Sequence, residues 1–291
     1  MKERSSAKGN LDRRQEQEAN PAEKEQLREE EEVQHRTAIG AHVVYEAILK
    51  EGEQELSRPA SALAFSGLAA GLSMGFSFLT QGFLEAHLPA TKWAPLVAKL
   101  GYSVGFLIVI LGRQQLFTEN TLTPVLPFLR HPNIRTLSQI ARLWIAVFLA
   151  NWVGTMLFAW VLGHSSIIED SSRDTFLKIG RQAMGDSFGG TMLKAVFAGW
   201  LIALLVWLLP YAETGRVTVI IIMTYVIALG SFSHIIAGSV DTFYLVALHD
   251  RTFGQYLIQF MLPTLIGNII GGIALVTALN HAQVVAGTDH D

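Results

Sequence analysis

Cysteine is absent from this chain of 291 residues, and charged residues are scarce. Without cysteine the chain has no disulfide framework and no site where thiolates hold a metal ion. Only 16% of the residues are charged, whereas 50% are hydrophobic. This composition favours a membrane protein over a soluble domain.

The few charged residues are distributed unevenly. Residues 1–58 hold 10 basic and 14 acidic side chains, including four consecutive glutamates at 29–32, whereas the rest of the chain holds 12 basic and 11 acidic ones. The balanced remainder offers no electropositive face, so we expect no nucleic-acid partner. Residues 1–58 have too little apolar surface to fold alone and are predicted to form a charged cytoplasmic tail.

Other absences narrow the class further. No secretory signal peptide pattern precedes the first hydrophobic run, so this run is expected to act as the targeting signal. No Ser-His-Asp arrangement, metal-ligand cluster or phosphate-binding glycine loop occurs in a plausible context. We therefore expect no enzyme, no catalytic residue, no metal and no cofactor.

Six hydrophobic runs are long enough to cross the roughly 30 Å hydrocarbon core of a bilayer. An even number places both termini on one side, and the uncleaved charged tail makes that side cytoplasmic. Residues 59–280 are thus predicted as the transmembrane domain, facing membrane lipid, and residues 281–291 as a short C-terminal tail. The runs are approximately 60–84, 94–111, 140–162, 192–209, 217–248 and 256–279.

Two polar interruptions cut the second and fifth runs, at residues 112–120 and 230–234. In lipid every backbone polar group needs a partner, so a broken helix persists only where protein buries it or where it lines a polar cavity. A pair of such breaks in corresponding positions of two halves is typical of a solute pathway near the bilayer midplane.

The two halves also share a short motif. Asn151-Trp-Val-Gly154 in the third run is repeated as Asn268-Ile-Ile-Gly271 in the sixth, and both this offset and that of the breaks are close to 117 residues. Because each half has three spans, duplicated halves must have opposite orientations in the membrane. The sequence therefore predicts an inverted 3+3 repeat.

The breaks carry the candidate functional groups. Thr118 and Asn120 offer hydrogen bonds to a small solute and to freed backbone groups. His234 is the ionisable group of the second break, and histidine exchanges protons near neutral pH. Asp241, farther along the fifth run, is an intramembrane acid that faces either a pore vestibule or a subunit contact.

These residues resemble the formate/nitrite transporter family. The resemblance is carried by Leu116-Phe117-Thr118, by the Phe-x-His of Phe232 and His234, and by the Asn-x-x-Gly-Gly that begins at Asn268. In particular, the chain is similar to bacterial inner-membrane members with a long charged N-terminal extension. The resemblance implies an all-α, aquaporin-like bundle of six transmembrane helices, the second and fifth broken, in a homopentamer with one pore per protomer.

The resemblance also implies roles for individual residues. Thr118 and His234 match the family's pore-central threonine and histidine. Independently of the resemblance, the polar residues Arg113, Asn120 and Glu119 of the first break are expected to face a cavity and to form a polar vestibule. The positions that form apolar constrictions in the family hold Leu116, Phe106, Tyr102 and Ile227.

The chain departs from the family's pattern at several positions. Residues 183–190 contain no counterpart of the family's lysine; Arg181 and Lys194 are the nearest basic residues. Gly238 replaces an asparagine, and Ile227 stands where a phenylalanine is usual in formate channels.

The predicted function is a channel or transporter for small monovalent anions or their conjugate weak acids, of the formate, nitrite, acetate, lactate and hydrosulfide class. A bare charge at the bilayer centre costs at least about 2.5–3.5 kcal/mol, so the solute is expected to be protonated near Thr118 and His234. His234 either lends this proton or only polarises the solute.

Two alternatives remain open from the sequence. The first is an aquaporin-like channel for a neutral solute, although the Asn-Pro-Ala triplet at residues 20–22 lies in the tail and not in a span. The second is a non-conducting membrane scaffold or regulator that acts through its tail. Residues 37–56 read as an amphipathic helix suited to the membrane surface or to capping the pore, with Val43, Val44, Ile48 and Leu56 apolar and Glu46, Lys50, Glu53 and Glu55 polar.

Overall fold

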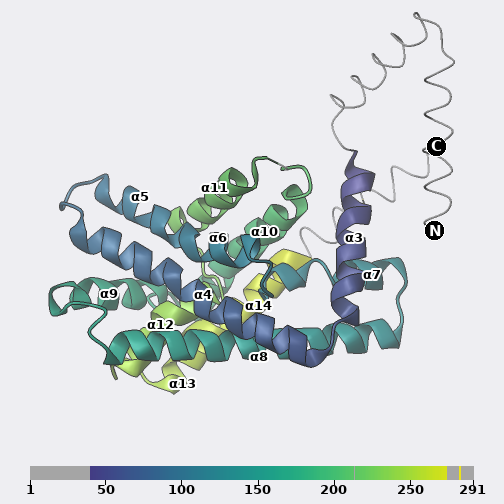
Figure 1. Ribbon diagram of the computed structural model, residues 1–291. Coiled ribbons are helices and arrows are strands. Elements are labelled where there is room, and N and C mark those ends of the chain that lie inside the picture. The colour runs from purple at the N-terminus through teal and green to yellow at the C-terminus, as the bar shows by residue number, and fades with distance from the viewer. Residues whose placement is uncertain (1–39, 213, 274–281, 283–291) are drawn as a thin grey trace, which may run out of the picture. The chain divides into compact units, whose positions relative to one another are not determined.

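The computed structural model describes residues 40–212, 214–273 and 282, and within these residues every regular element is a helix (Figure 1). This confirms the all-α prediction for the described part of the chain. The elements are α3 (Ala41–Ser57), α4 (Ala60–His87), α5 (Ala94–Ala98), η1 (Lys99–Tyr102), α6 (Ser103–Leu111), η2 (Glu119–Thr121), α7 (Val125–Arg130), α8 (Ile134–His164), α9 (Asp170–Ala183), α10 (Phe188–Leu208), α11 (Arg216–Leu229), α12 (Ala237–Ala247), α13 (Phe253–Gln255), η3 (Tyr256–Met261) and α14 (Leu262–Ile270).

Five helical stretches among the described residues are long and apolar enough to cross a membrane. The fifth predicted run is instead two shorter helices, α11 and α12, separated by residues 230–236. Residues 274–279 of the sixth predicted run lie outside the described residues, as do residues 1–39 of the predicted tail. The five stretches are Ala60–His87, Ala94–Leu111, Ile134–His164, Phe188–Leu208 and Phe253–Ile273.

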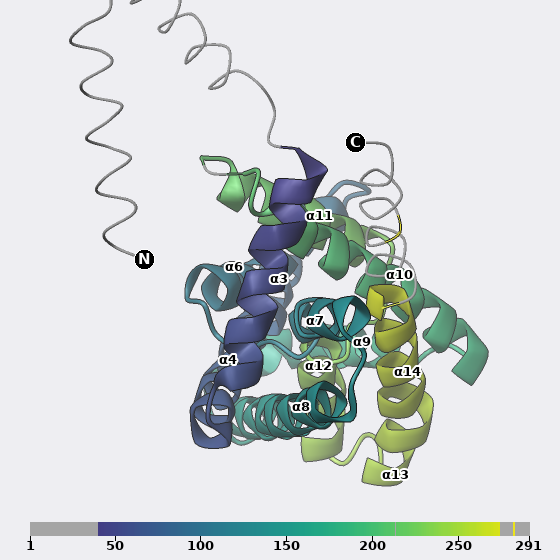
Figure 2. The ribbon, with the colours of Figure 1, turned by 90° about the vertical axis from the view of Figure 1, so that its right-hand side faces the viewer.

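The long helices pack in two corresponding pairs. In the first half α4 runs along α8, and in the second half α10 runs along α14 (Figures 1 and 2). These are the first and third spans of each half, as the predicted repeat requires. The broken helices, α6 with η2 and α11 with α12, complete the two halves.

Helix α3 packs against protein with one apolar face. Its Val44, Ile48 and Leu49 are buried against Leu122 and Leu126, near and on α7. The amphipathic pattern predicted for residues 37–56 was wrong at two positions: Val43 is 58% exposed, and Glu55 turns inward to hydrogen-bond Gln115 and Thr123. Residues 37–39 lie outside the described range.

Each helix pair has a close contact where a glycine faces an asparagine. A Cβ at Gly71 of α4 would overlap the carbonyl oxygen of Asn151, and a Cβ at Gly199 of α10 would overlap that of Asn268. Small residues allow membrane helices to pack at short distance, where lipid provides no hydrophobic drive for association. Glycine is therefore required at both contacts.

We expect Gly199→Ala to destabilise the protein by about 1–3 kcal/mol, because the added methyl group must push α10 away from α14. Thermal unfolding of the detergent-solubilised protein measures the effect. Gly189→Ala, near the start of the same helix, is the control, because no non-neighbouring atom of the described residues lies within 4 Å of a Cβ there. Equal melting temperatures for the two variants would show that the close contact has no energetic importance.

Candidate functional site

The side chain of Asn151 holds the first break in place. Its Oδ1 accepts a hydrogen bond from the Phe117 backbone N–H at 2.9 Å, and its Nδ2 donates to the carbonyl oxygens of Gly67 and Gln115 at 2.7 and 2.9 Å. Asn151 is fully buried. One amide thus bonds two backbone groups of the break, the Phe117 N–H and the Gln115 carbonyl, and ties them to the intact helix α4 through Gly67.

Asn268 holds the second break in the same way. Its Oδ1 accepts from the Ile235 N–H at 2.8 Å, and its Nδ2 donates to the carbonyl oxygens of Ala195 and Ser233 at 2.8 and 2.9 Å. We call Asn151 and Asn268, with these bonds, the asparagine clamps.

The backbone of the two breaks has the same local course. Phe117 and Ile235, which donate to the clamps, lie 118 residues apart, as do Arg113 and Ser231. Arg113 and Ser231 have left-handed φ angles of 50° and 49°. This conformation costs a non-glycine residue roughly 1–2 kcal/mol, so its recurrence at corresponding positions indicates a constrained, duplicated turn.

The clamps bring Thr118 and His234 together. Thr118 Oγ1 lies 2.8 Å from His234 Nε2, and the two residues are 0% and 1% exposed. The contact joins the two halves of the chain at the centre of the fold. The sequence placed these residues on separate breaks, and the structure makes them hydrogen-bond partners.

The hydrogen bonds of His234 define its tautomer. The Ala237 N–H donates to His234 Nδ1 at 3.1 Å. Because a backbone N–H can only donate, Nδ1 is an acceptor, and in the neutral ring the proton is on Nε2. Nε2–H therefore donates to Thr118 Oγ1, and the hydroxyl hydrogen of Thr118 is left for another acceptor.

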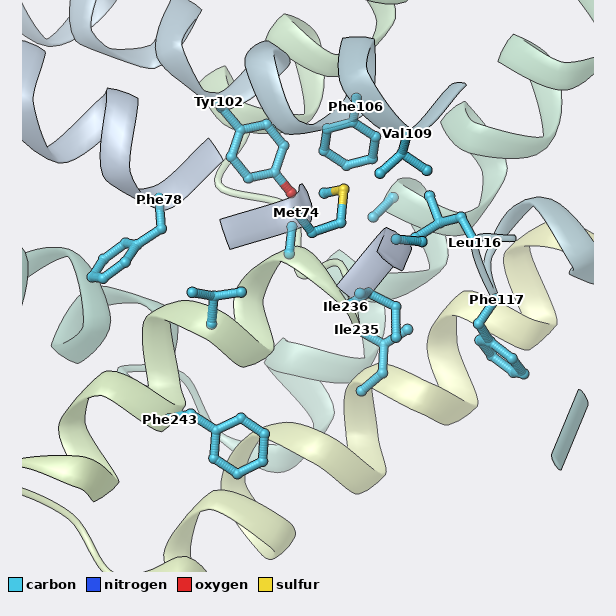
Figure 3. Close-up of a cluster of buried hydrophobic side chains, with 14 of the residues drawn as sticks. Met74, Phe78, Tyr102, Phe106, Val109, Leu116, Phe117, Ile235, Ile236 and Phe243 are labelled. Carbon is cyan, nitrogen blue, oxygen red and sulfur yellow. The ribbon is translucent and has the colours of Figure 1, made fainter. Parts of the chain in front are cut away.

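Apolar side chains surround this pair. The Phe106 ring meets the His234 ring edge to face, with centroids 5.0 Å apart, and Tyr102 lies 5.3 Å from Phe106. Tyr102, Phe106 and Val109 project from one stretch of helix toward Met74 and Leu116 (Figure 3). Phe106, Leu116 and Ile227 are all 0% exposed, so the predicted constriction residues lie in the buried cluster.

A cavity of about 620 Å³, the α9-side vestibule, opens beside His234. Tyr102, Ile227 and Asp241 line it, as do Lys99, Lys178 and Lys194. Lys178 pairs with Glu85 at 2.9 Å and Lys194 with Asp186 at 2.6 Å. The Lys99 Nζ donates to the carbonyl oxygen of Leu229 at 3.2 Å.

A second cavity of about 390 Å³, the α3-side vestibule, is lined in part by residues of α3. Glu119 and Arg113 line it, and Arg113 pairs with Glu51 of α3 at 2.9 Å. The Oε1 of Glu119 is buried and has no hydrogen-bond partner among the described residues. Asn120 is not among the residues lining the cavity; its side chain donates to Gln115 Oε1 at 2.9 Å and so supports the vestibule wall.

Comparison with known proteins decides the family. The model of the formate/nitrite transporter family matches residues 42–282, which is most of the chain. The chain belongs to this family.

Two relatives illustrate the range of similarity. The inner membrane protein YfdC of Escherichia coli (strain K12) is 42% identical over 262 residues, which cover 90% of this chain and 84% of YfdC. The formate channel BtFdhC of Bacillus thuringiensis is 26% identical over 242 residues, covering 80% of this chain and 91% of the channel.

Solved structures share the fold. A pentameric formate channel with formate bound aligns with a TM-score of 0.66 at 18% identity, covering 78% of this chain and 98% of that one. An ion channel described as a member of the same family aligns with a TM-score of 0.72 at 16% identity, covering 83% and 99%. The described helices therefore adopt the architecture of this family.

The structure also shows which features the sequence missed. The family's lysine has no counterpart in residues 183–190, yet lysines from α9, α10 and η1 converge on the α9-side vestibule. Arg181, the other basic residue considered, instead pairs with Asp250. The asparagine motifs were noticed as a repeat, but their side-chain bonds to the breaks were not foreseen.

The buried carboxyl group of Glu55 on α3 leads us to predict that the docking of this helix depends on pH. Burial raises the pKa of the Glu55 carboxyl above its usual range, although hydrogen bonds from Gln115 and Thr123 oppose the rise. An acid with a raised pKa in the docked state takes up a proton on docking, so docking of α3 is favoured at low pH and weakens as the pH rises through the raised pKa. Glu55→Gln should remove this dependence.

Melting temperature measured against pH tests this expectation. The wild type should lose stability as the pH rises from the usual glutamate range, and Glu55→Gln should show a flatter curve. Glu53→Gln is the control, because Glu53 is exposed on the same helix. Parallel curves for the wild type and Glu55→Gln would contradict a role for this carboxyl group.

Proposed function

We propose that this chain is a channel or transporter for small monovalent anions or their conjugate weak acids, in the formate, nitrite, acetate, lactate and hydrosulfide class. The observation that carries the proposal is the buried hydrogen bond between Thr118 and His234. His234 lines the α9-side vestibule, and Glu119, the residue that follows Thr118, lines the α3-side vestibule. Family membership and the formate channels among the relatives support it. They do not favour a neutral-solute channel or a non-conducting scaffold.

The site suits a solute that is an anion in the vestibule and a neutral acid at the apolar constrictions. Phe106 and Leu116 are fully buried beside the Thr118–His234 pair, and a bare charge in such surroundings costs at least about 2.5–3.5 kcal/mol. A neutral acid crosses at far lower cost. The lysines of the α9-side vestibule attract the anion, and Tyr102, Phe106, Ile227 and Leu116 form the apolar constrictions.

In this proposal His234 polarises the site and does not lend the proton. Both of its ring nitrogens are engaged, Nδ1 by the Ala237 N–H and Nε2 by Thr118. The Nε2–H bond holds the Thr118 oxygen, so the Thr118 hydroxyl hydrogen is directed to the solute. Thr118 is the donor that meets the solute, and His234 positions it.

We place the protein in the bacterial inner membrane as a homopentamer with both termini cytoplasmic. The similarity to an Escherichia coli inner membrane protein supports the location, and the fold shared with a pentameric formate channel supports the assembly. The long, exposed apolar side chains of α8, such as Ile145, Val153 and Trp160, suit contacts with lipid or with neighbouring subunits.

Uptake into proteoliposomes tests the function. We expect the wild type to take up at least one of formate, nitrite, acetate, lactate and hydrosulfide, with more uptake at lower external pH. His234→Ala and Thr118→Val should each lower uptake by about 5- to 150-fold, because a buried hydrogen-bonding group left without a partner costs about 1–3 kcal/mol. His131→Ala, in an exposed loop, is the control.

Two results would count against the proposal. Wild-type protein of verified assembly that carries none of these anions above the level of empty liposomes would overturn the function. His234→Ala that keeps full, pH-dependent uptake would overturn the assigned role of the Thr118–His234 pair.

Native mass spectrometry from detergent tests the assembly. We expect a species of five times the protomer mass of 32.0 kDa. A stable monomer or dimer that carries anions after reconstitution would show that the pentamer is not needed for transport.

A further inference from the structure

Asp241 is the intramembrane acid that the sequence left without a role. It lies on α12 and lines the α9-side vestibule together with Gly238, three residues earlier on the same face, and with His234. Residues three apart on a helix are neighbours on its surface. The carboxyl group is therefore part of the cavity that borders the Thr118–His234 pair.

The other carboxyl groups of this vestibule have ionic partners, and that of Asp241 has none among the described residues. Glu85 pairs with Lys178, and Asp186 pairs with Lys194. No hydrogen bond or ion pair joins the Asp241 carboxyl group to another described side chain, and the bond recorded for it is with its own backbone N–H. An intramembrane carboxyl group without a charged partner indicates a functional site.

Ionisable groups from several elements line the vestibule, and none of them forms an ion pair with Asp241 among the described residues. Helix α8 packs on α12 but contributes no residue to the cavity lining. Tyr256 of η3 hydrogen-bonds Ser239 and Trp152. The groups lining the cavity are Glu85 on α4, Lys99 and Tyr102 on η1, Lys178 on α9, Asp186 and Lys194 around the start of α10, and His234.

A comparison of the two halves of the repeat shows that only the second half has a carboxyl group at the position of Asp241. At the 118-residue offset of the two breaks, Asp241 corresponds to Thr123. Thr123 lines the α3-side vestibule and donates to Glu55 Oε2 at 2.7 Å. The first half thus has a neutral hydroxyl where the second half has a carboxyl group, so the fold itself does not require an acid here.

An anion in the vestibule and an ionised Asp241 repel each other. Occupancy by the anion and protonation of Asp241 are therefore linked, each favouring the other. The vestibule lysines attract the anion, but an ammonium group holds its proton far more tightly than a carboxylic acid does. His234 has both ring nitrogens engaged. Among the lining groups, a protonated Asp241 is the one suited to give a proton to a weak-acid anion.

We propose that Asp241 is the proton donor of the α9-side vestibule. The Asp241 carboxylic acid gives its proton to the solute anion: the O–H bond on Asp241 breaks, an O–H bond (or S–H bond for hydrosulfide) forms on the solute, and Asp241 becomes a carboxylate. A hydronium ion from the external solution then gives a proton to the Asp241 carboxylate and becomes water. The neutral solute then moves past Phe106 and reaches Thr118. This inference rests on the proposed function, to which it adds the source of the proton.

Formate uptake into proteoliposomes, measured at external pH values from about 5 to 8, tests the proposal with wild type, Asp241→Asn and Asp241→Glu. We expect Asp241→Asn to lower uptake at least about tenfold at neutral pH. The deficit should shrink steadily toward acidic pH, because formic acid formed in solution needs no donor. Asp241→Glu should restore uptake at neutral pH.

Asp174→Asn is the matched control, since Asp174 is an exposed carboxylate on α9 that does not line the vestibule. If Asp241→Asn loses the same fraction of uptake at every pH, Asp241 has a structural role and the donor role is overturned. A pH profile of Asp241→Asn like that of the wild type also overturns the donor role. If the wild type takes up another anion of the class but no formate, the same variants are compared with that anion as the solute. Wild type that carries no anion overturns the proposed function together with this inference.

Discussion

The asparagine clamps are the interaction on which the pathway depends. A helix that stops in the middle of a membrane leaves backbone groups without partners, and each such group costs several kcal/mol in lipid. Asn151 and Asn268 each bond three backbone groups, one N–H and two carbonyls, while fully buried themselves. An apolar residue at either position removes all three bonds at once. Without the clamps the breaks that carry Thr118 and His234 would not be stable.

The clamps also explain why the helix pairs are so close. An amide side chain reaches only a few ångströms, so α4 must approach α8, and α10 must approach α14, before the asparagine can bond both its neighbour and the break. Gly71 and Gly199 allow that approach because neither has a Cβ. The tight pairing of long helices, the left-handed turns at Arg113 and Ser231, and the central hydrogen bond are therefore parts of one arrangement, repeated in each half.

The sequence predicted those features that follow from hydrophobic runs and their interruptions: the all-α class, the breaks, and the residues Thr118 and His234 that meet there. It could not predict contacts made by residues distant in sequence but close in space. Lys99, Lys178 and Lys194 come from separate segments, and only packing brings them to one vestibule. Helix α3 was predicted as amphipathic, but its inward Glu55 was placed on the polar face, because periodicity does not show that a polar partner such as Thr123 is buried opposite it.

The Thr118–His234 pair at the centre of the site is neutral. The groups that can change the charge of a solute therefore lie outside this pair. With Nδ1 accepting from a backbone N–H, His234 can gain a proton only by losing the bond to Ala237, in a buried position beside Phe106 where an added charge is costly. The charged groups instead lie in the two vestibules, lysines and acids on the α9 side and α3 carboxylates with Arg113 on the other. In the proposed function, Thr118 and His234 therefore distinguish solutes by their hydrogen-bonding groups. The same proposal has a solute become a neutral acid before it reaches them. A change in a vestibule charge is then expected to alter the pH dependence of passage while the central pair stays the same.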